Sequence, residues 1–296
     1  MKQTATRTQK AKVNGVDIAF VERGHGQPVV FVHGGTGDLR TWEGQMEEFS
    51  TDHRAIALSC RGYWPNRKLE PDERITLHTF VEDVAAFIRA LEASPVHLVG
   101  HSSPGGFGGL LLAARYPDLL RSLVLLEPPA FPVLGVNIPP KPSQLLRLLA
   151  RNPRAAAGMV RFGAKGMAPA LKAFERGEDA EGLRIFMRAN TSAETVAGLP
   201  EEKFERFLDN VGPLKAQIRT GFPWFSDADA RGVRAPTLLV SGTESPSHIT
   251  AVTDRLEALL PDVSRFDIAG ASHNMFDSHP TEFNTGVLEF IANQDG

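Results

Sequence analysis

One stretch constrains the fold of this chain more than any other. An apolar run, Val96–Val99, leads directly into Gly100-His101-Ser102-Ser103-Pro104-Gly105-Gly106. The run favours a buried strand, and the apolar residues that follow recur as on one face of a helix: Phe107, Leu110, Leu111 and Ala114. A sharp strand-to-helix turn with glycines around it exposes a serine at the start of the helix, where negative charge is stabilised. The stretch therefore predicts a nucleophilic serine.

Two serines compete for that role. The nucleophilic serine of such a turn, or elbow, usually stands in the pattern Gly-x-Ser-x-Gly, and here the turn has one additional residue. Counted from Gly100 at the end of the strand, the nucleophile is Ser102; counted back from Gly105, it is Ser103. An oxyanion hole needs the backbone N–H of the residue after the nucleophile. Pro104 follows Ser103 and has no N–H, whereas Ser103 itself can donate to an oxyanion formed at Ser102. We favour Ser102 and keep Ser103 as the alternative nucleophile.

Composition excludes several classes of protein. The chain has 296 residues, 42% of them hydrophobic, so it can bury a sizeable core. Its net charge is −3 with both signs interspersed, so we expect neither a nucleic-acid partner nor a membrane partner. Cys60 is the single cysteine, and the histidines lack ligand spacing, so no disulfide, metal or cofactor is expected. Residues 1–11 are polar and no apolar run approaches the ~20 residues of a membrane span, so we expect a cytoplasmic protein.

Strand and helix patterns alternate over most of the chain. Strand patterns cover residues 16–21, 28–32, 54–58, 96–100, 122–126, 237–240 and 264–268, and helix patterns cover 75–91, 249–260 and 282–293. This alternation predicts an α/β fold with a doubly wound, mostly parallel sheet.

The alternation stops between residues 131 and 234. This part begins near proline-rich stretches and then has helix patterns at 144–150, 155–174, 180–188 and 201–208, without a strand pattern. We expect an all-helical cap, or lid, at 131–234, inserted after the strand at 122–126, taken as the sixth of the sheet, into a core domain formed by 1–130 and 235–296. The alternative is a helical extension without substrate contacts.

Three motifs follow one another in a recognisable order: His33-Gly34-Gly35, then Gly100-His101-Ser102, then Gly270-Ala271-Ser272-His273. This order resembles the α/β-hydrolase family over nearly the whole chain. The resemblance implies an eight-stranded sheet and a triad in the chain order serine, acid, histidine. It places the catalytic base at His273, after the last strand, and the oxyanion donors at the amides of Gly35 and Ser103.

The acid departs from the usual family pattern. The position where the family usually has an Asp, after the seventh strand, holds Ser245, and Glu244 lies one residue earlier. Glu127 instead closes the sixth strand, where some branches of the family, including certain haloalkane dehalogenases and lactone hydrolases, keep the triad acid. A carboxylate at the end of a buried strand has few structural reasons to be there. We favour Glu127 and keep Glu244 as the alternative acid.

Apolar and aromatic residues in the loops and the helical segment suggest an apolar pocket. The predicted substrate-binding residues are Gly34, Trp42, Trp64, Phe131, Trp224, Phe225 and Met275.

These features together predict a serine hydrolase that cleaves a carboxylic ester or lactone of an apolar small molecule through an acyl-enzyme. Haloalkane dehalogenases and epoxide hydrolases of this fold use an Asp nucleophile, which Ser102 disfavours. Hydrolases of carbon–carbon bonds, thioesterases and cofactor-free haloperoxidases share the triad and stay open. A non-catalytic or weakly catalytic small-molecule binder is the alternative from another class, because both the elbow and the acid depart from the pattern. We expect a monomer or a homodimer.

Overall fold

A computed structural model describes residues 7–70 and 73–295. Its centre is an eight-stranded sheet in the order β1-β2-β4-β3-β5-β6-β7-β8, with antiparallel pairing only at β1–β2 and β2–β4. The strands are β1 (Gln9–Val13), β2 (Val16–Arg23), β3 (Pro28–Val32), β4 (Arg54–Leu58), β5 (Val96–His101), β6 (Leu120–Leu126), β7 (Thr237–Gly242) and β8 (Val263–Ile268). The predicted fold class, with its mostly parallel sheet, is confirmed.

The edge strand β1 is missing from the sequence prediction. It pairs with β2 through a two-residue turn, in which Asn14 has φ 46° and Gly15 has φ 77°. Asn-Gly is the preferred sequence of such hairpin turns, because both positions require positive φ. The exposed Lys10 and Lys12 protect this open edge from pairing with other strands. The Asn-Gly pair was the signal that could have revealed β1.

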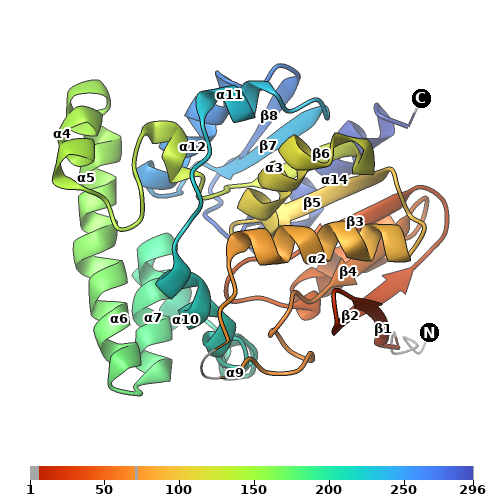
Figure 1. The fold of residues 1–296 in the computed structure, drawn as a ribbon, viewed down its shortest axis with the longest axis horizontal. Helices are drawn as coiled ribbons and strands as arrows, with labels where there is room; N and C mark the ends of the chain where they lie inside the picture. The colour runs from red at the N-terminus through yellow and green to blue at the C-terminus, as the bar shows by residue number, and fades with distance from the viewer. Residues whose placement is uncertain (1–6, 71–72, 296) are drawn as a thin grey trace.

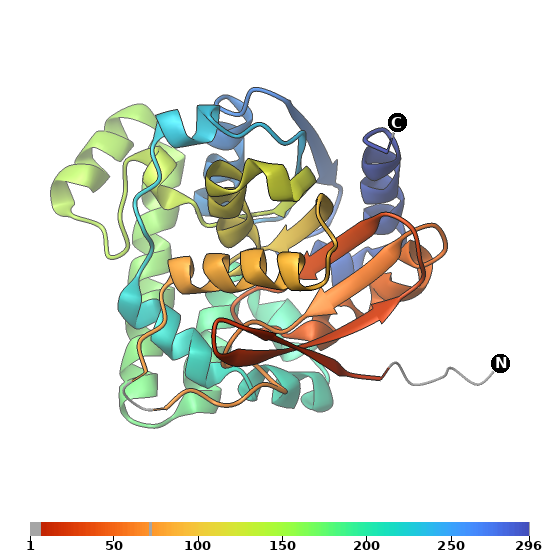
Figure 2. The same cartoon turned by 45° about the vertical axis from the view of Figure 1, so that its right-hand side comes forward.

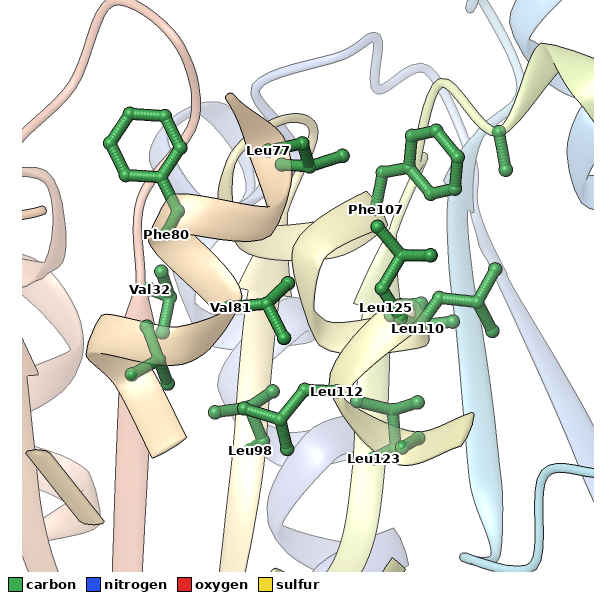
Figure 3. Packing of buried hydrophobic residues seen from close by; sticks show 14 of the residues in the cluster. Val32, Leu77, Phe80, Val81, Leu98, Phe107, Leu110, Leu112, Leu123 and Leu125 are labelled. Carbon is green, nitrogen blue, oxygen red and sulfur yellow. The ribbon is translucent and has the colours of Figure 1, made fainter. Parts of the chain in front are cut away.

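Helices cover both faces of the sheet. On β3, Val30 and Val32 face one core cluster, while Val29 and Phe31 face another, as strand alternation requires. The first cluster is covered by α2 (Leu77–Ala90), α3 (Gly105–Arg115) and α12 (Ser247–Glu257), and Figure 3 shows side chains of α2 and α3 packed against the strands. The second is covered by α1 (Glu43–Phe49), α13 (Met275–Ser278) and α14 (Pro280–Ala292).

The segment between β6 and β7 is helical. It contains η3 (Phe131–Leu134), α4 (Pro142–Arg151), α5 (Pro153–Arg161), η4 (Phe162–Met167, a π-helical turn), α6 (Ala168–Glu175), α7 (Asp179–Asn190), α8 (Ala193–Ala197), α9 (Glu201–Leu208), α10 (Val211–Thr220) and α11 (Asp227–Arg231). Residues 131–234, all of them described, include no strand. Figures 1 and 2 show α4 to α7, in green, gathered on one side of the sheet. Sequence periodicity missed α8, α10 and α11, of which two have only five residues each.

The helical segment packs in two ways. Its later helices, from α6 to α10, form a small core of their own around Phe174, Leu183 and Phe204. Its first helices instead join the main core through Leu148 and Met159, and α5 lies against α12. The division into a core domain and a separate cap therefore stays a prediction.

Two further findings concern membrane-spanning helices and metal-ligating groups. In residues 7–70 and 73–295, no helix combines the length and the apolar character needed to cross a membrane. The same residues contain no group of three or more metal-ligating side chains. The structure does not describe residues 1–6, which belong to the polar stretch from which we expect no signal peptide.

Candidate active site

Ser102 occupies the sharp turn between β5 and α3. It has φ 50°, a left-handed conformation that costs free energy in a residue with a side chain. Two hydrogen bonds hold it there: its N–H donates to the Leu126 carbonyl at 2.9 Å, and its own carbonyl accepts from the Phe107 N–H at 2.8 Å. A Cβ on Gly100 would lie 2.3 Å from the carbonyl oxygen of Gly105, so only glycine lets the strand and helix approach this closely.

The additional residue of the elbow lies between Ser102 and Gly105. Pro104 forms an isolated antiparallel bridge with Gly34, and the Gly105 N–H donates to the His33 carbonyl at 3.0 Å. The longer turn is thus tied to the loop after β3. This contact brings the two segments that carry the predicted oxyanion donors side by side.

A polar network engages the Ser103 hydroxyl. Ser103 is 6% exposed, and its Oγ donates to Oε1 of Gln217 on α10 at 3.0 Å. Nε2 of Gln217 donates to the Tyr63 hydroxyl, which in turn donates to the Gly35 carbonyl at 3.3 Å. The network links α10 to both sides of the turn. Neither Tyr63, in the loop after β4, nor Gln217, on α10, was predicted, because their hydrogen-bond partners lie far away in the chain and no local pattern records them.

Glu127 and His273 form a buried pair. Oε2 of Glu127 lies 2.7 Å from Nδ1 of His273, while Oε1 accepts from the Ser241 hydroxyl at 2.9 Å and from the Gly242 N–H at 3.0 Å. Burial raises the pKa of the Glu127 carboxyl, but the hydrogen bond and the charge interaction with His273 outweigh it and hold that pKa below its usual value. Glu127 is therefore a carboxylate that orients the imidazole.

Glu244 lies elsewhere. Its side chain is exposed on the loop after β7, where its N–H donates to the Ala271 carbonyl at 2.9 Å. Of the two predicted acids, the structure brings only Glu127 against His273.

Two other histidines, His101 and His33, hold backbone segments of the site in place through hydrogen bonds. Nε2 of His101 donates to the His273 carbonyl at 3.0 Å, and burial keeps the pKa of His101 well below its usual value. The N–H of Cys60 donates to Nε2 of His33 at 2.9 Å, so the other ring nitrogen carries the proton and donates to the Gly34 carbonyl. Burial lowers the pKa of His33 to about 4. Both rings are neutral and fix backbone positions.

The two predicted oxyanion donors are close together. A Cβ on Gly35 would lie 3.2 Å from the Ser103 carbonyl oxygen. The bridge between Gly34 and Pro104 turns the Gly35 N–H toward the Ser103 carbonyl, whereas the Ser103 N–H has neither a backbone nor a side-chain acceptor in the described part of the chain. The Ser103 N–H is therefore available to an arriving carbonyl oxygen.

A cavity of about 980 Å³, its opening to solvent included, lies over these groups. Ser102, Glu127 and His273 line it, together with Gly35 and Ser103. The rest of the lining is mostly apolar: Phe131, Ile138, Phe162, Met167, Phe186, Met187, Leu214, Ile218, Phe222 and Ile249. No lysine or arginine is among the described residues that line it. Such walls fit an apolar group.

Most of the predicted substrate-binding residues lie outside this cavity, and only Phe131 lines it. Trp42 and Met275 are fully buried in the second core cluster, where Trp42 packs 5.1 Å from Phe31. Phe225 is also buried, against Phe107. These large side chains face the sheet rather than the substrate space, because burying them in the core removes the most apolar surface from water.

The other three predicted substrate-binding residues lie at exposed positions or in a neighbouring opening. The Arg40 guanidinium lies over the Trp64 ring, with its Cζ 3.8 Å from the centre of that ring. Trp224 is 58% exposed. Gly34 lines a separate opening beside the cavity. The apolar walls come instead from η4, α7 and α10, whose inward residues the sequence pattern did not distinguish from ordinary helix packing.

Comparison with known proteins agrees with this architecture. Residues 29–285 match the model of the family described as "Alpha/beta hydrolase family". A 2-(acetamidomethylene)succinate hydrolase of Mesorhizobium japonicum is 25% identical, over 96% of this chain and 95% of that protein. A 2-hydroxy-6-oxo-6-(2'-aminophenyl)hexa-2,4-dienoic acid hydrolase of Metapseudomonas resinovorans is 24% identical, over 94% and 88%. Among solved structures, an epoxide hydrolase of Bacillus megaterium has a TM-score of 0.75 at 22% identity, covering 96% of this chain and all of that chain.

Proposed function

We propose that this chain, which belongs to the alpha/beta hydrolase family, is a serine hydrolase that cleaves a carboxylic ester or lactone of an apolar small molecule. Ser102 is the nucleophile, His273 the general base and Glu127 the acid of the triad. The observation that carries the proposal is the 2.7 Å contact between Glu127 and His273 in the cavity that Ser102 lines.

The reaction follows from these positions. His273 accepts the proton of the Ser102 hydroxyl as its oxygen attacks the substrate carbonyl, and Glu127 stabilises the resulting imidazolium. The amide of Ser103 donates to the oxyanion, a contribution that typically changes the rate by ~10²–10³. His273 then protonates the leaving alcohol. Water, deprotonated by His273, hydrolyses the acyl-enzyme and restores Ser102.

The assignment of Ser102 over Ser103 rests on three observations. Ser102 has the strained φ of 50°, the Ser103 hydroxyl is engaged by Gln217, and Pro104 has no N–H to offer an oxyanion formed at Ser103. The apolar lining of the cavity supports an apolar acyl or alcohol group.

Labelling with a fluorophosphonate probe tests the proposal directly. The reagent forms a stable adduct only with an activated serine, and the tryptic peptide 90–115 carries both candidates. We expect stoichiometric label on Ser102, unchanged in Ser103→Ala and absent in Ser102→Ala. Label on Ser103 would move the nucleophile. A folded wild-type protein without label, and without turnover of an activated ester, would favour a binder.

A matched set of substrates separates the reaction classes. An ester, a lactone, a thioester and a carbon–carbon diketone with similar apolar chains are compared by kcat/KM. We expect the ester or the lactone to lead. A diketone or thioester that exceeds both by tenfold would assign the same triad to the other reaction.

A further inference from the structure

A second cleft adjoins the catalytic cavity on the helical segment. It lies between α5, η4, α7 and the loop that leads into α12. Four cationic side chains line it, Arg154, Arg161, Lys165 and Arg188, and one acidic side chain, Glu244. The catalytic cavity, in contrast, has no cation in its described lining.

The spacing of the cations follows from the helix. Arg154, Arg161 and Lys165 are separated by seven and four residues, so they lie on one face of the helix formed by α5 and η4. At the helical rise, this row extends for about 16 Å. Arg188 comes from α7, which packs against η4. Figure 1 shows α5 and α6 in one long column with α7 beside it.

None of the four cations has an ion-pair partner within the described part of the chain, although arginines elsewhere pair repeatedly. Residues 128–174 contain seven lysines and arginines and no acidic residue. Four like charges around one carboxylate, that of Glu244, repel one another, and an anionic ligand would relieve this repulsion.

The backbone adds to the positive electrostatic potential of this cleft. Pro246, Ser247 and His248, at the start of the eleven-residue helix α12, line the same cleft. A helix N-terminus carries partial positive charge and favours anions. Gly158 allows the close approach of α5, because a Cβ there would lie 2.6 Å from Oγ of Ser247.

The cleft and the catalytic cavity share a wall. Phe162 and Thr191 line both. The buried Phe162 ring stacks on His248, with 4.7 Å between ring centres. An elongated molecule whose chain passes Phe162 and Thr191 would place one end at Ser102 and the other among the cations.

We infer that this cationic cleft binds the anionic end of the substrate, a carboxylate or a phosphate that an apolar chain separates from the scissile carbonyl. The inference rests on the proposed function of Ser102. It narrows the substrate class from apolar esters to amphiphilic ones with a negative charge remote from the reacting bond.

Charge preference tests the inference. 4-Nitrophenyl monoesters of dicarboxylic acids of increasing length are compared with their neutral ω-methyl esters, and acyl esters of ω-hydroxy acids place the anion on the alcohol side. In one of the two series, we expect kcat/KM of the charged member to exceed that of the neutral member by about tenfold at low salt, and by less at high salt. Equal kcat/KM for charged and neutral members in both series would overturn the inference. Chains ending in a phosphate monoester distinguish the two anions.

Charge-removal variants locate the effect. Arg161→Gln combined with Lys165→Gln is expected to abolish most of the preference, measured as the ratio of kcat/KM for the charged ester to kcat/KM for the neutral ester. Lys172→Gln, an exposed cation on α6 outside the cleft, is the matched control. An unchanged preference in the double variant, or an equal loss in the control, would contradict the inference.

A binding measurement separates this inference from the proposed function. Calorimetric titration of Ser102→Ala compares nonanedioic acid monoamide with the neutral diamide. We expect the monoamide to bind about tenfold more tightly, and the difference to vanish when Arg161→Gln and Lys165→Gln are added. If the monoamide binds more tightly in this way while wild type hydrolyses no ester, the inference about the cleft is supported and the hydrolase proposal is contradicted. If wild type hydrolyses neutral esters and the monoamide has no advantage, the cleft inference falls alone.

Discussion

Oε2 of Glu127 lies 2.7 Å from Nδ1 of His273, although the two residues are 146 positions apart in the chain. Glu127 follows β6 and His273 follows β8, and both strands pair with β7 between them. Parallel strands end at the same edge of the sheet, so their following loops meet there. Two further donors, the Ser241 hydroxyl and the Gly242 N–H, hold the carboxylate in place.

Glu127→Gln should lower kcat by roughly 10³–10⁴, because an amide can neither stabilise the imidazolium nor hold the correct tautomer of His273. Kinetics on an activated ester, with circular dichroism to verify the fold, measure this. Glu244→Gln is the matched control, since its side chain is exposed and away from His273. A larger loss of kcat in Glu244→Gln than in Glu127→Gln would reverse the assignment of the acid.

Gly100→Ala should destabilise the protein by about 3 kcal/mol or more, since the added Cβ would lie 2.3 Å from the Gly105 carbonyl oxygen, which is backbone and cannot move aside. Gly44→Ala should instead stabilise by about 0.5–1 kcal/mol, because that position in α1 is exposed, has open space around it and does not precede a proline. Urea unfolding measures both changes. A Gly100→Ala variant as stable as wild type would mean that β5 and α3 are less tightly packed than described.

Gln217→Leu should destabilise the protein by about 1–3 kcal/mol, because it removes the partner of the Ser103 and Tyr63 hydroxyls. We also expect kcat to fall by about tenfold, less than the ~10² for a lost oxyanion donor, since the Ser103 amide would only shift. Thermal unfolding and kinetics measure the two effects. Arg219→Gln, exposed on the same helix, is the control and should change neither.

Acid should destabilise the fold through buried histidines. Burial lowers the pKa of both His33 and His248 to about 4, whereas an unfolded histidine takes up a proton below about pH 6.5. The free energy of unfolding that these neutral histidines contribute is fully present above pH 6.5 and is lost as the pH falls toward 4. The lowered pKa of Glu127 acts in the same direction at lower pH.

His248→Phe measures this contribution. The replacement keeps a ring against Phe162 and removes a buried Nε2 that has no described partner. Between pH 7 and pH 5, its free energy of unfolding should fall by about 2 kcal/mol less than that of wild type. His25→Ala, at an exposed position, should leave the pH dependence unchanged. Identical pH slopes for wild type and His248→Phe would refute the prediction.

The sequence by itself determined the layout of the fold and the position of the elbow. Strands and helices could be located because each pattern depends on neighbours within a few residues. The preference for Ser102 over Ser103 likewise needed only a local fact, that Pro104 has no N–H to donate. The Asn14-Gly15 turn carried an equally local signal for β1.

Only the tertiary structure decided which groups meet. Glu127 and Glu244 were both close to a strand end in the sequence, and the packing of β6, β7 and β8 set one against His273 and left the other on the surface. Trp42 and Phe131 are both aromatic and both buried in core clusters, yet of the two only Phe131 also lines the cavity. The same holds for the unpaired row from Arg154 to Lys165. The reason is physical: burial, hydrogen-bond partners and counter-charges come from residues far apart in the chain, and no local pattern records them.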